Sequence, residues 1–177
     1  MLTLSNEGKV ETQTRTEPLF DVWVDPITVS GVRDGANWHF VSKDGHLHTF
    51  NVTTENVSLQ RRLSLISESE RADNWRISGF QHLAIHRTEG RLYFLVHEGG
   101  PESFEDPGTH VWIYDIASGQ KIDEIELERM ALSIEVSQDD KAQLYAIAAE
   151  FNMPEIFQIY LYSVGGLPYL EKHLKLV

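Results

Sequence analysis

The chain contains no cysteine among its 177 residues. Disulfide frameworks, thiolate zinc sites and cysteine nucleophiles are therefore excluded. The chain also lacks a run of about 18 apolar residues, the length that a transmembrane helix needs, so we expect no membrane insertion. The opening segment MLTLSNEGKV has neither a basic stretch nor an apolar stretch. We therefore expect no signal peptide in this segment.

Basic charge is scarce as well. The chain has 15 Lys and Arg against 27 Asp and Glu, which gives a formal net charge of -12. Nucleic acid binding needs clustered Lys and Arg, so we expect no nucleic acid partner. The hydrophobic and charged fractions, 41% and 24%, are typical of a soluble globular protein, and the length allows one domain with a real core.

Motifs of enzymatic catalysis are missing too. We find no phosphate-binding glycine loop, no nucleophile elbow and no spacing typical of a catalytic triad. These three kinds of catalytic site are therefore not indicated by the sequence.

Helical periodicity is nearly absent, and ISESERADN, at residues 66–74, is the only candidate for a polar turn or short helix. Strand patterns dominate instead, as alternating or β-branched and aromatic segments broken by Gly, Asp and Asn. They predict successive hairpins with turns at residues 6–8, 43–45, 88–90, 117–119, 138–140 and 165–166.

The hairpins repeat in order. LAIHRTEGRLYFLV aligns with IEVSQDDKAQLYAIA, which places Tyr93 and Tyr145 52 positions apart (145 minus 93). VWIYDIASGQKIDEIEL aligns with IYLYSVGGLPYLEKHLKL, which places Asp115 and Ser163 48 positions apart (163 minus 115). Two hairpins, or four strands, in about fifty residues are typical of a β-propeller blade. A β-sandwich is the alternative, but it gives no reason for two-hairpin units to repeat.

We predict blades near residues 26–66, 79–127 and 130–177, with half a blade before them at residues 1–24. The predicted fold class is all-β, a β-propeller of which about three and a half blades are present. A propeller ring closes with at least about four blades. The chain is therefore either the C-terminal part of a larger propeller or a half-ring that completes itself as a homodimer.

One segment resembles a known family. ERADNWRISGFQHLAIHRTEGRLYFLVH, at residues 70–97, is similar to the heavy, β-propeller subunit of the methylamine dehydrogenase and aromatic amine dehydrogenase family. The matching pieces are ERADNW, Arg76, Gly79, the pair His86-Arg87 and GRLYFLVH. GKVETQTRTEPLFDVWVDP, HFVSKDGHLHTFNV and HVWIYDIASGQKIDEIEL also look like that family. The resemblance is collinear over nearly the whole chain, and it matches only the C-terminal half of family members.

The resemblance implies a seven-bladed propeller in a periplasmic α2β2 enzyme. That enzyme oxidatively deaminates primary amines to aldehydes and passes the electrons to a small copper protein. Its cofactor, tryptophan tryptophylquinone, belongs to the light subunit, which is cross-linked by many disulfides. This chain has no cysteine and so is not the light subunit. The resemblance therefore implies a non-catalytic propeller subunit that binds no cofactor itself and has the light subunit as its partner.

Trp75 and Arg76 are adjacent in the segment 67–78, which we predict to be a loop between two blades. In a propeller, that loop and the long loop Glu98–His110 emerge on one face, and the turn at residues 115–121 lies on the other. Trp and Arg are enriched at interface hot spots. The residues assigned to a partner or ligand face are Trp75, Arg76, Gln81, His82 and Phe104. The structural alternative is that Trp75 wedges between blades while Arg76 pairs with a nearby carboxylate.

Two further function classes stay open. The first is a half-propeller that dimerises and acts as a ligand-binding or protein-binding module without catalysis. The second is a metal-dependent propeller hydrolase of the lactonase type, for which the innermost strands offer only Gln81, His82 and Glu135. The sequence also pairs His46 with His48 and His82 with His86, but it places no third ligand beside either pair. A metal site needs three or four ligands, so we expect none.

Overall fold

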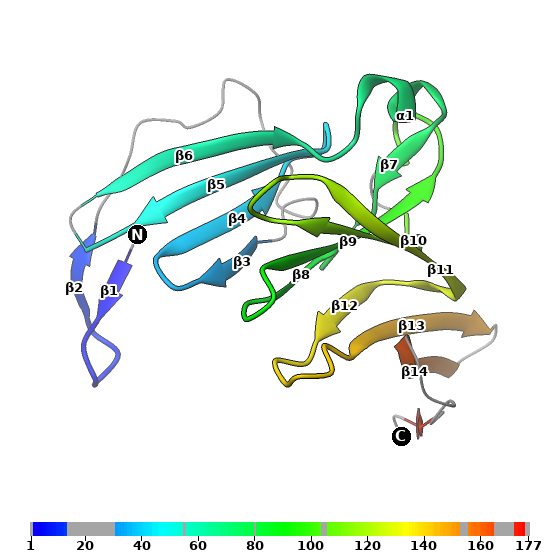
Figure 1. Cartoon of the computed structure of the whole chain (residues 1–177). Helices are drawn as coiled ribbons and strands as arrows, with labels where there is room; N and C mark the ends of the chain where they lie inside the picture. Colours follow the sequence, from blue (N-terminus) through cyan, green and yellow to red (C-terminus); the bar gives the residue numbers. More distant parts are fainter. Residues whose placement is uncertain are drawn as a thin grey trace.

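The computed structural model describes residues 2–13, 31–54, 56–79, 81–103, 106–152, 156–164 and 172–175. Strands dominate these residues, and one short helix, α1 (Glu68–Ala72), is present among them (Figure 1). The strands before the helix are β1 (Leu2–Leu4), β2 (Val10–Gln13), β3 (Gly31–Asp34), β4 (Asn37–Val41), β5 (His46–Val52) and β6 (Val57–Ser64). The strands after it are β7 (Trp75–Ile77), β8 (Leu83–His86), β9 (Arg91–Glu98), β10 (Gly108–Asp115), β11 (Lys121–Ala131), β12 (Ser133–Val136), β13 (Leu144–Asn152), β14 (Ile156–Val164) and β15 (Lys172–Lys175).

Three antiparallel sheets follow one another along the chain, and we name them the first, second and third blades. The first contains β3–β6, the second β7–β11 and the third β12–β15. The second blade lies between the other two, and the hairpin of β1 and β2 forms a separate two-stranded sheet (Figure 1). The all-β, β-propeller fold class predicted from the sequence is confirmed.

Five of the six predicted hairpin turns are confirmed. Tight turns join β1 to β2, β4 to β5, β8 to β9, β10 to β11 and β12 to β13. Gly45 shows why the sequence needs glycine in such a turn. Its φ is +76°, and a Cβ placed on it would lie 2.8 Å from Cβ of Ile66. The sixth predicted turn, at residues 165–166, lies outside the described residues.

The predicted loop 67–78 contains a strand, which corrects the sequence interpretation. β7 pairs with the far end of β9, so that Trp75 lies opposite Glu98 and Ile77 opposite Val96. β8 pairs with the near end of the same strand. Since β9 is eight residues long and β8 only four, the backbone groups along the second half of β9 need another partner. β7 supplies it.

Strict alternation along β9 and β10 buries both faces of the second blade. One face forms a first interblade core. Its members are Val41, Leu47, Leu65 and Ile66 on one side, and Ile77, Leu83, Leu92, Phe94, Val96, Trp112 and Tyr114 on the other. The opposite face forms a second interblade core. Its members are Ala84, Tyr93, Leu95, Val111, Ile113, Leu127 and Ala131, with Ile134, Val136, Leu144, Ala146 and Ala148 of the third blade. The sequence repeat therefore corresponds to a repeat of packing.

Polar contacts join neighbouring blades at the turn ends. The guanidinium of Arg87 donates through Nε and Nη2 to the carbonyl of Arg33 in the first blade, at 3.2 and 2.9 Å. Gln138 of the third blade donates to the carbonyl of Ile85 at 2.7 Å and accepts from the amide of Arg87 at 3.1 Å. Since backbone carbonyls carry no net charge, these contacts hold adjacent blades in register without ion pairs.

Candidate functional site

The two long connections of the second blade form one loop face, as the sequence predicted. We define the loop face as α1, β7 and the described part of the 99–107 connection. The amide of Gly99 donates to the carbonyl of Asn74 at 2.9 Å, and the amide of Gly79 donates to the carbonyl of Asp106 at 3.1 Å. At the other end of the blade, the amide of Ile116 donates to the carbonyl of Gly90 at 2.9 Å. The short turns are thus gathered opposite the loop face.

Helix α1 buries none of its side chains, so polar contacts position it. Ser67 and Glu70 form a capping box at its start, which satisfies two backbone amides that the helix leaves unpaired. Arg71 donates to the carbonyl of Asp44 in the first blade at 2.7 Å. Arg76 donates to the carbonyl of Arg71 at 2.8 Å. The helix is therefore tied to the first blade and to β7 by two arginines.

Trp75 and Arg76 have different environments. Trp75 is half-buried, and its ring lies 5.0 Å from the rings of both Trp112 and His110. It packs against the first interblade core, which is the position that the structural alternative predicted for it. Arg76 does not follow that alternative, because its Nη1 donates to the carbonyls of Arg71 and Trp75 and no carboxylate of the described residues pairs with it.

Gln81 and His82, also assigned to the partner face, lie away from the loop face. Gln81 is exposed at the junction with the third blade, where its Nε2 donates to Oε1 of Glu135 at 3.1 Å and its backbone bridges Ser133. His82 is fully buried, with its ring 5.9 Å from that of Phe94. Phe104 lies outside the described residues. Of the four described residues among these five, the structure brings Trp75 and Arg76 together on the loop face.

Sequence reasoning missed His97 of β9, whose side chain contacts the 99–107 connection. His97 is buried, and its Nε2 lies 2.9 Å from Oγ of Ser103. Because the Ser103 hydroxyl donates to the carbonyl of Gly100 at 2.7 Å, its oxygen accepts from His97, which puts the ring proton on Nε2. Burial, with a smaller contribution from Arg76, holds the pKa of His97 below its ordinary value. A neutral imidazole thus fixes the loop.

Lys121 was also missed. It begins β11, and its ammonium lies 3.9 Å from the centroid of the Trp112 ring, between Glu70 and Glu124. One feature of the sequence could have indicated the contact between Lys121 and Trp112. Lys121 and Trp112 lie on the two strands of a predicted hairpin, at the distance along the chain that allows cross-strand neighbours.

The histidine pairs form other contacts. Nδ1 of His46 lies 2.9 Å from Oδ2 of Asp44, and Nε2 of His48 lies 3.0 Å from Oγ of Ser42. Nε2 of His86 lies 3.0 Å from the carbonyl of Asp139. Across the described ranges, no three His, Cys, Asp or Glu side chains gather as metal ligands would. Nor do these ranges contain a helix long and apolar enough to span a membrane.

Comparison with known proteins agrees with the resemblance. The family model of the methylamine dehydrogenase heavy chain matches residues 10–162. The heavy chain of Methylophilus methylotrophus is 25% identical over 152 residues, which are 85% of this chain and 38% of that protein. The heavy chain of Paracoccus versutus is 33% identical over 105 residues, which are 59% of this chain and 25% of that protein.

A solved structure, the β-propeller domain of Cps50 (Swd1) from Myceliophteria thermophila, superposes with a TM-score of 0.46 at 16% identity. That superposition covers 82% of this chain and 41% of that one. The chain spans less than two fifths of the length of the heavy chains that it matches. The family match nevertheless covers the first two blades and most of the third, and the chain belongs to the methylamine dehydrogenase heavy chain family.

Proposed function

We propose that this chain is the non-catalytic propeller subunit, or the C-terminal part of it, of a tryptophan tryptophylquinone-dependent amine dehydrogenase. The enzyme oxidatively deaminates primary amines and passes electrons to a small copper protein in the periplasm. The quinone belongs to the light subunit, and this chain supplies no cofactor ligand. Its role is to hold the light subunit, to exclude water from the quinone and to shape substrate entry.

The family match over residues 10–162 carries this proposal. The fold supports it, because a propeller with two buried interblade cores is a rigid support for a partner. The absence of cysteine excludes the disulfide-rich light subunit as an identity for this chain.

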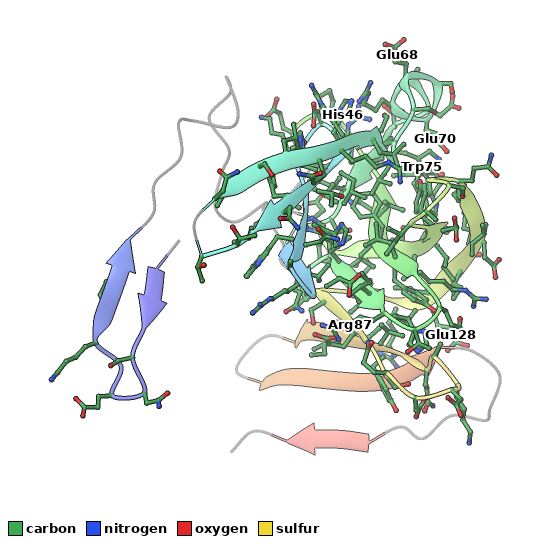
Figure 2. All side chains as sticks on the ribbon, turned by 60° about the vertical axis from the view of Figure 1, so that its left-hand side comes forward. His46, Glu68, Glu70, Trp75, Arg87 and Glu128 are labelled. Carbon is green, nitrogen blue, oxygen red and sulfur yellow. The ribbon has the colours of Figure 1, made fainter. Side chains whose placement is uncertain are left out.

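We further propose that the loop face meets the light subunit. Figure 2 shows Trp75 beneath the Glu68 and Glu70 side chains of α1, with Arg87 toward the opposite end of the blade. On this face, Trp75 packs inward and supports the surface, while Arg76 is only partly buried and has no carboxylate partner in the described chain. Arginine in such a setting is a frequent interface hot spot. Arg76 is therefore the residue of the loop face best suited to contact the partner.

The test is co-expression of the tagged chain with a methylamine dehydrogenase light subunit, followed by affinity purification. We expect the light subunit to co-purify, with quinone absorbance and amine-dependent reduction of a dye. Arg76→Ala should lower the amount of light subunit retained. Arg91→Ala is the matched control, because Arg91 lies at the other end of β9 and pairs with Glu89 at 2.9 Å.

Three outcomes separate the alternatives. Failure of the wild-type chain to retain the light subunit would contradict the proposed function. Equal retention by Arg76→Ala and Arg91→Ala would contradict the assignment of the loop face and leave the function standing. A homodimer that retains no light subunit would favour a self-pairing half-propeller that binds a ligand or protein without catalysis.

A further inference from the structure

A charged side chain of the second blade sits in a cage of three groups from three elements. The ammonium of Lys121 lies 3.9 Å from the Trp112 ring centroid, 3.3 Å from Oε1 of Glu70 and 3.3 Å from Oε2 of Glu124. Trp112 comes from β10, Glu124 from β11 and Glu70 from α1. We name Trp112, Glu70 and Glu124 the ammonium cage.

Two of the three cage groups are held in place independently of Lys121. Trp112 is buried in the first interblade core, and it is the cross-strand neighbour of Glu124. Glu70 uses one carboxylate oxygen for the capping box, where Oε2 accepts from the amide of Ser67 at 2.8 Å and from its hydroxyl at 2.7 Å. The other oxygen, Oε1, is left for the cation. Trp112 and Glu70 are therefore held by contacts that do not involve Lys121, while the carboxylate of Glu124 is exposed and contacts Lys121 itself.

The chemistry of the cage matches a primary ammonium. Such a group carries three N–H donors and one positive charge, and the cage offers two carboxylate acceptors and one aromatic face. The lysine side chain is 33% exposed, so the cage opens to solvent. A quaternary ammonium would keep the attraction to the ring and lose both hydrogen bonds.

We propose that the ammonium cage is a binding site for primary alkylammonium groups, with Lys121 as its resident ligand. Occupation of the cage joins α1 to β11 and stabilises the loop face. Lys121 is tethered, which gives it an effective concentration of about a millimolar or more, so an external alkylammonium competes only when Lys121 is removed or the amine is abundant. This inference does not rest on the proposed function.

The test is rescue of Lys121→Ala by methylammonium chloride. We expect the substitution to lower Tm, and methylammonium to restore Tm along a saturable curve while quenching or shifting tryptophan fluorescence. Sodium chloride at the same ionic strength should not restore Tm, and tetramethylammonium should restore less. Lys121→Met should show no rescue, because the unbranched apolar side chain fills the space over Trp112.

Two controls make the test decisive. Lys9→Ala removes a lysine paired at 3.2 Å with Glu7 on an exposed turn, where no aromatic ring of the described residues lies over its ammonium, and methylammonium should leave its Tm unchanged. Lys121→Ala combined with Glu124→Gln keeps the capping box and removes one negative charge from the cage, so its rescue should be weaker. Equal rescue by sodium and methylammonium, or equal rescue with and without Glu124, would overturn the proposal.

Discussion

Leu95 of the second blade and Ile147 of the third occupy equivalent positions, 52 residues apart (147 minus 95). Each is apolar and lies on the first long strand of its blade, β9 or β13, on the face turned away from the preceding blade. Leu95 is 0% exposed, whereas Ile147 is 37% exposed. Val41, at the same position in the first blade, is 0% exposed.

The difference in exposure comes from the presence or absence of a covering blade, and not from the strand that carries the residue. Val41 is covered by the second blade and Leu95 by the third. The face of β12 and β13 that carries Ile147 has no such cover in the described chain, while their other face fills the second interblade core. Equivalent apolar positions of the three blades are therefore buried only where a following blade covers them. This is the physical reason why propellers close into rings.

The largest expected effect comes from truncating the covered member of the pair. Leu95→Ala should lower the free energy of unfolding by about 2–5 kcal/mol, because it removes buried methyl groups and leaves a cavity. Ile147→Ala should change it by only about 0.5 kcal/mol, as exposed positions do. Urea denaturation of both variants checks this. Similar losses would mean that the two positions are equally covered.

A second comparison tests how tightly the second interblade core is packed around Leu95. A Cβ on Gly108 would lie 2.2 Å from Cγ of Leu95, so Gly108→Ala should cost about 1–3 kcal/mol through overpacking. Gly100 has no atom within 4 Å of the same position, so Gly100→Ala is the matched control and should leave stability nearly unchanged. Thermal denaturation measures both, and an unchanged Tm for Gly108→Ala would show a looser second core.

Two adjacent arginines of β6 allow the stability contributed by a contact across blades to be compared with that of a contact within a blade. Arg61 donates to the carbonyls of Ile116 and Ala117 in the next blade, at 2.6 and 3.1 Å. Arg61→Ala should cost about 1–2 kcal/mol.

Arg62 is the internal control, since within the described part of the chain its side chain forms an exposed ion pair with Asp44 at 3.5 Å. Arg62→Ala should cost no more than about 0.5 kcal/mol. The Arg61 loss should persist in high salt, because its acceptors are uncharged. A loss that disappears in salt would contradict the carbonyl assignment.

The smallest expected effect is a pH dependence of the loop face. Burial holds the pKa of His97 below its ordinary value, so the folded chain favours the neutral ring. The contribution of His97 is therefore complete above the unfolded pKa of about 6.5, and it is lost as pH falls from there through the lower folded pKa. His97→Gln should flatten this part of the pH profile. Denaturation at stepwise pH measures it, and a profile that is unchanged in the variant would exclude His97 as its source.

The sequence predicted the repeating features of the fold well. The turns at Gly45, Gly90 and Gly119 and the offset between Tyr93 and Tyr145 follow from local backbone requirements and side-chain alternation, which a sequence shows directly. The sequence did not predict strand β7. A strand of three residues has no pattern of its own, and β7 forms only because it pairs with the far end of β9.

The loop face was predicted only in part. Its location follows from topology, and Trp75 and Arg76 were found because their residue types are unusual for a loop. His82, which the sequence analysis assigned to the partner face, is fully buried, and alternation alone does not say which side of a short inner strand is covered. His97 and Lys121 depend on contacts with Ser103 and Glu70, which lie on other elements and leave no periodic signal.

The absence of native cysteine makes the central comparison directly measurable. Leu95→Cys and Ile147→Cys would each place a single thiol in the chain, and the rate of labelling by a thiol reagent reports its exposure. The account predicts rapid labelling at position 147 and protection at position 95. Equal protection at the two positions, independent of protein concentration, would contradict the claim that the third blade carries an open face that the next blade of a propeller should cover.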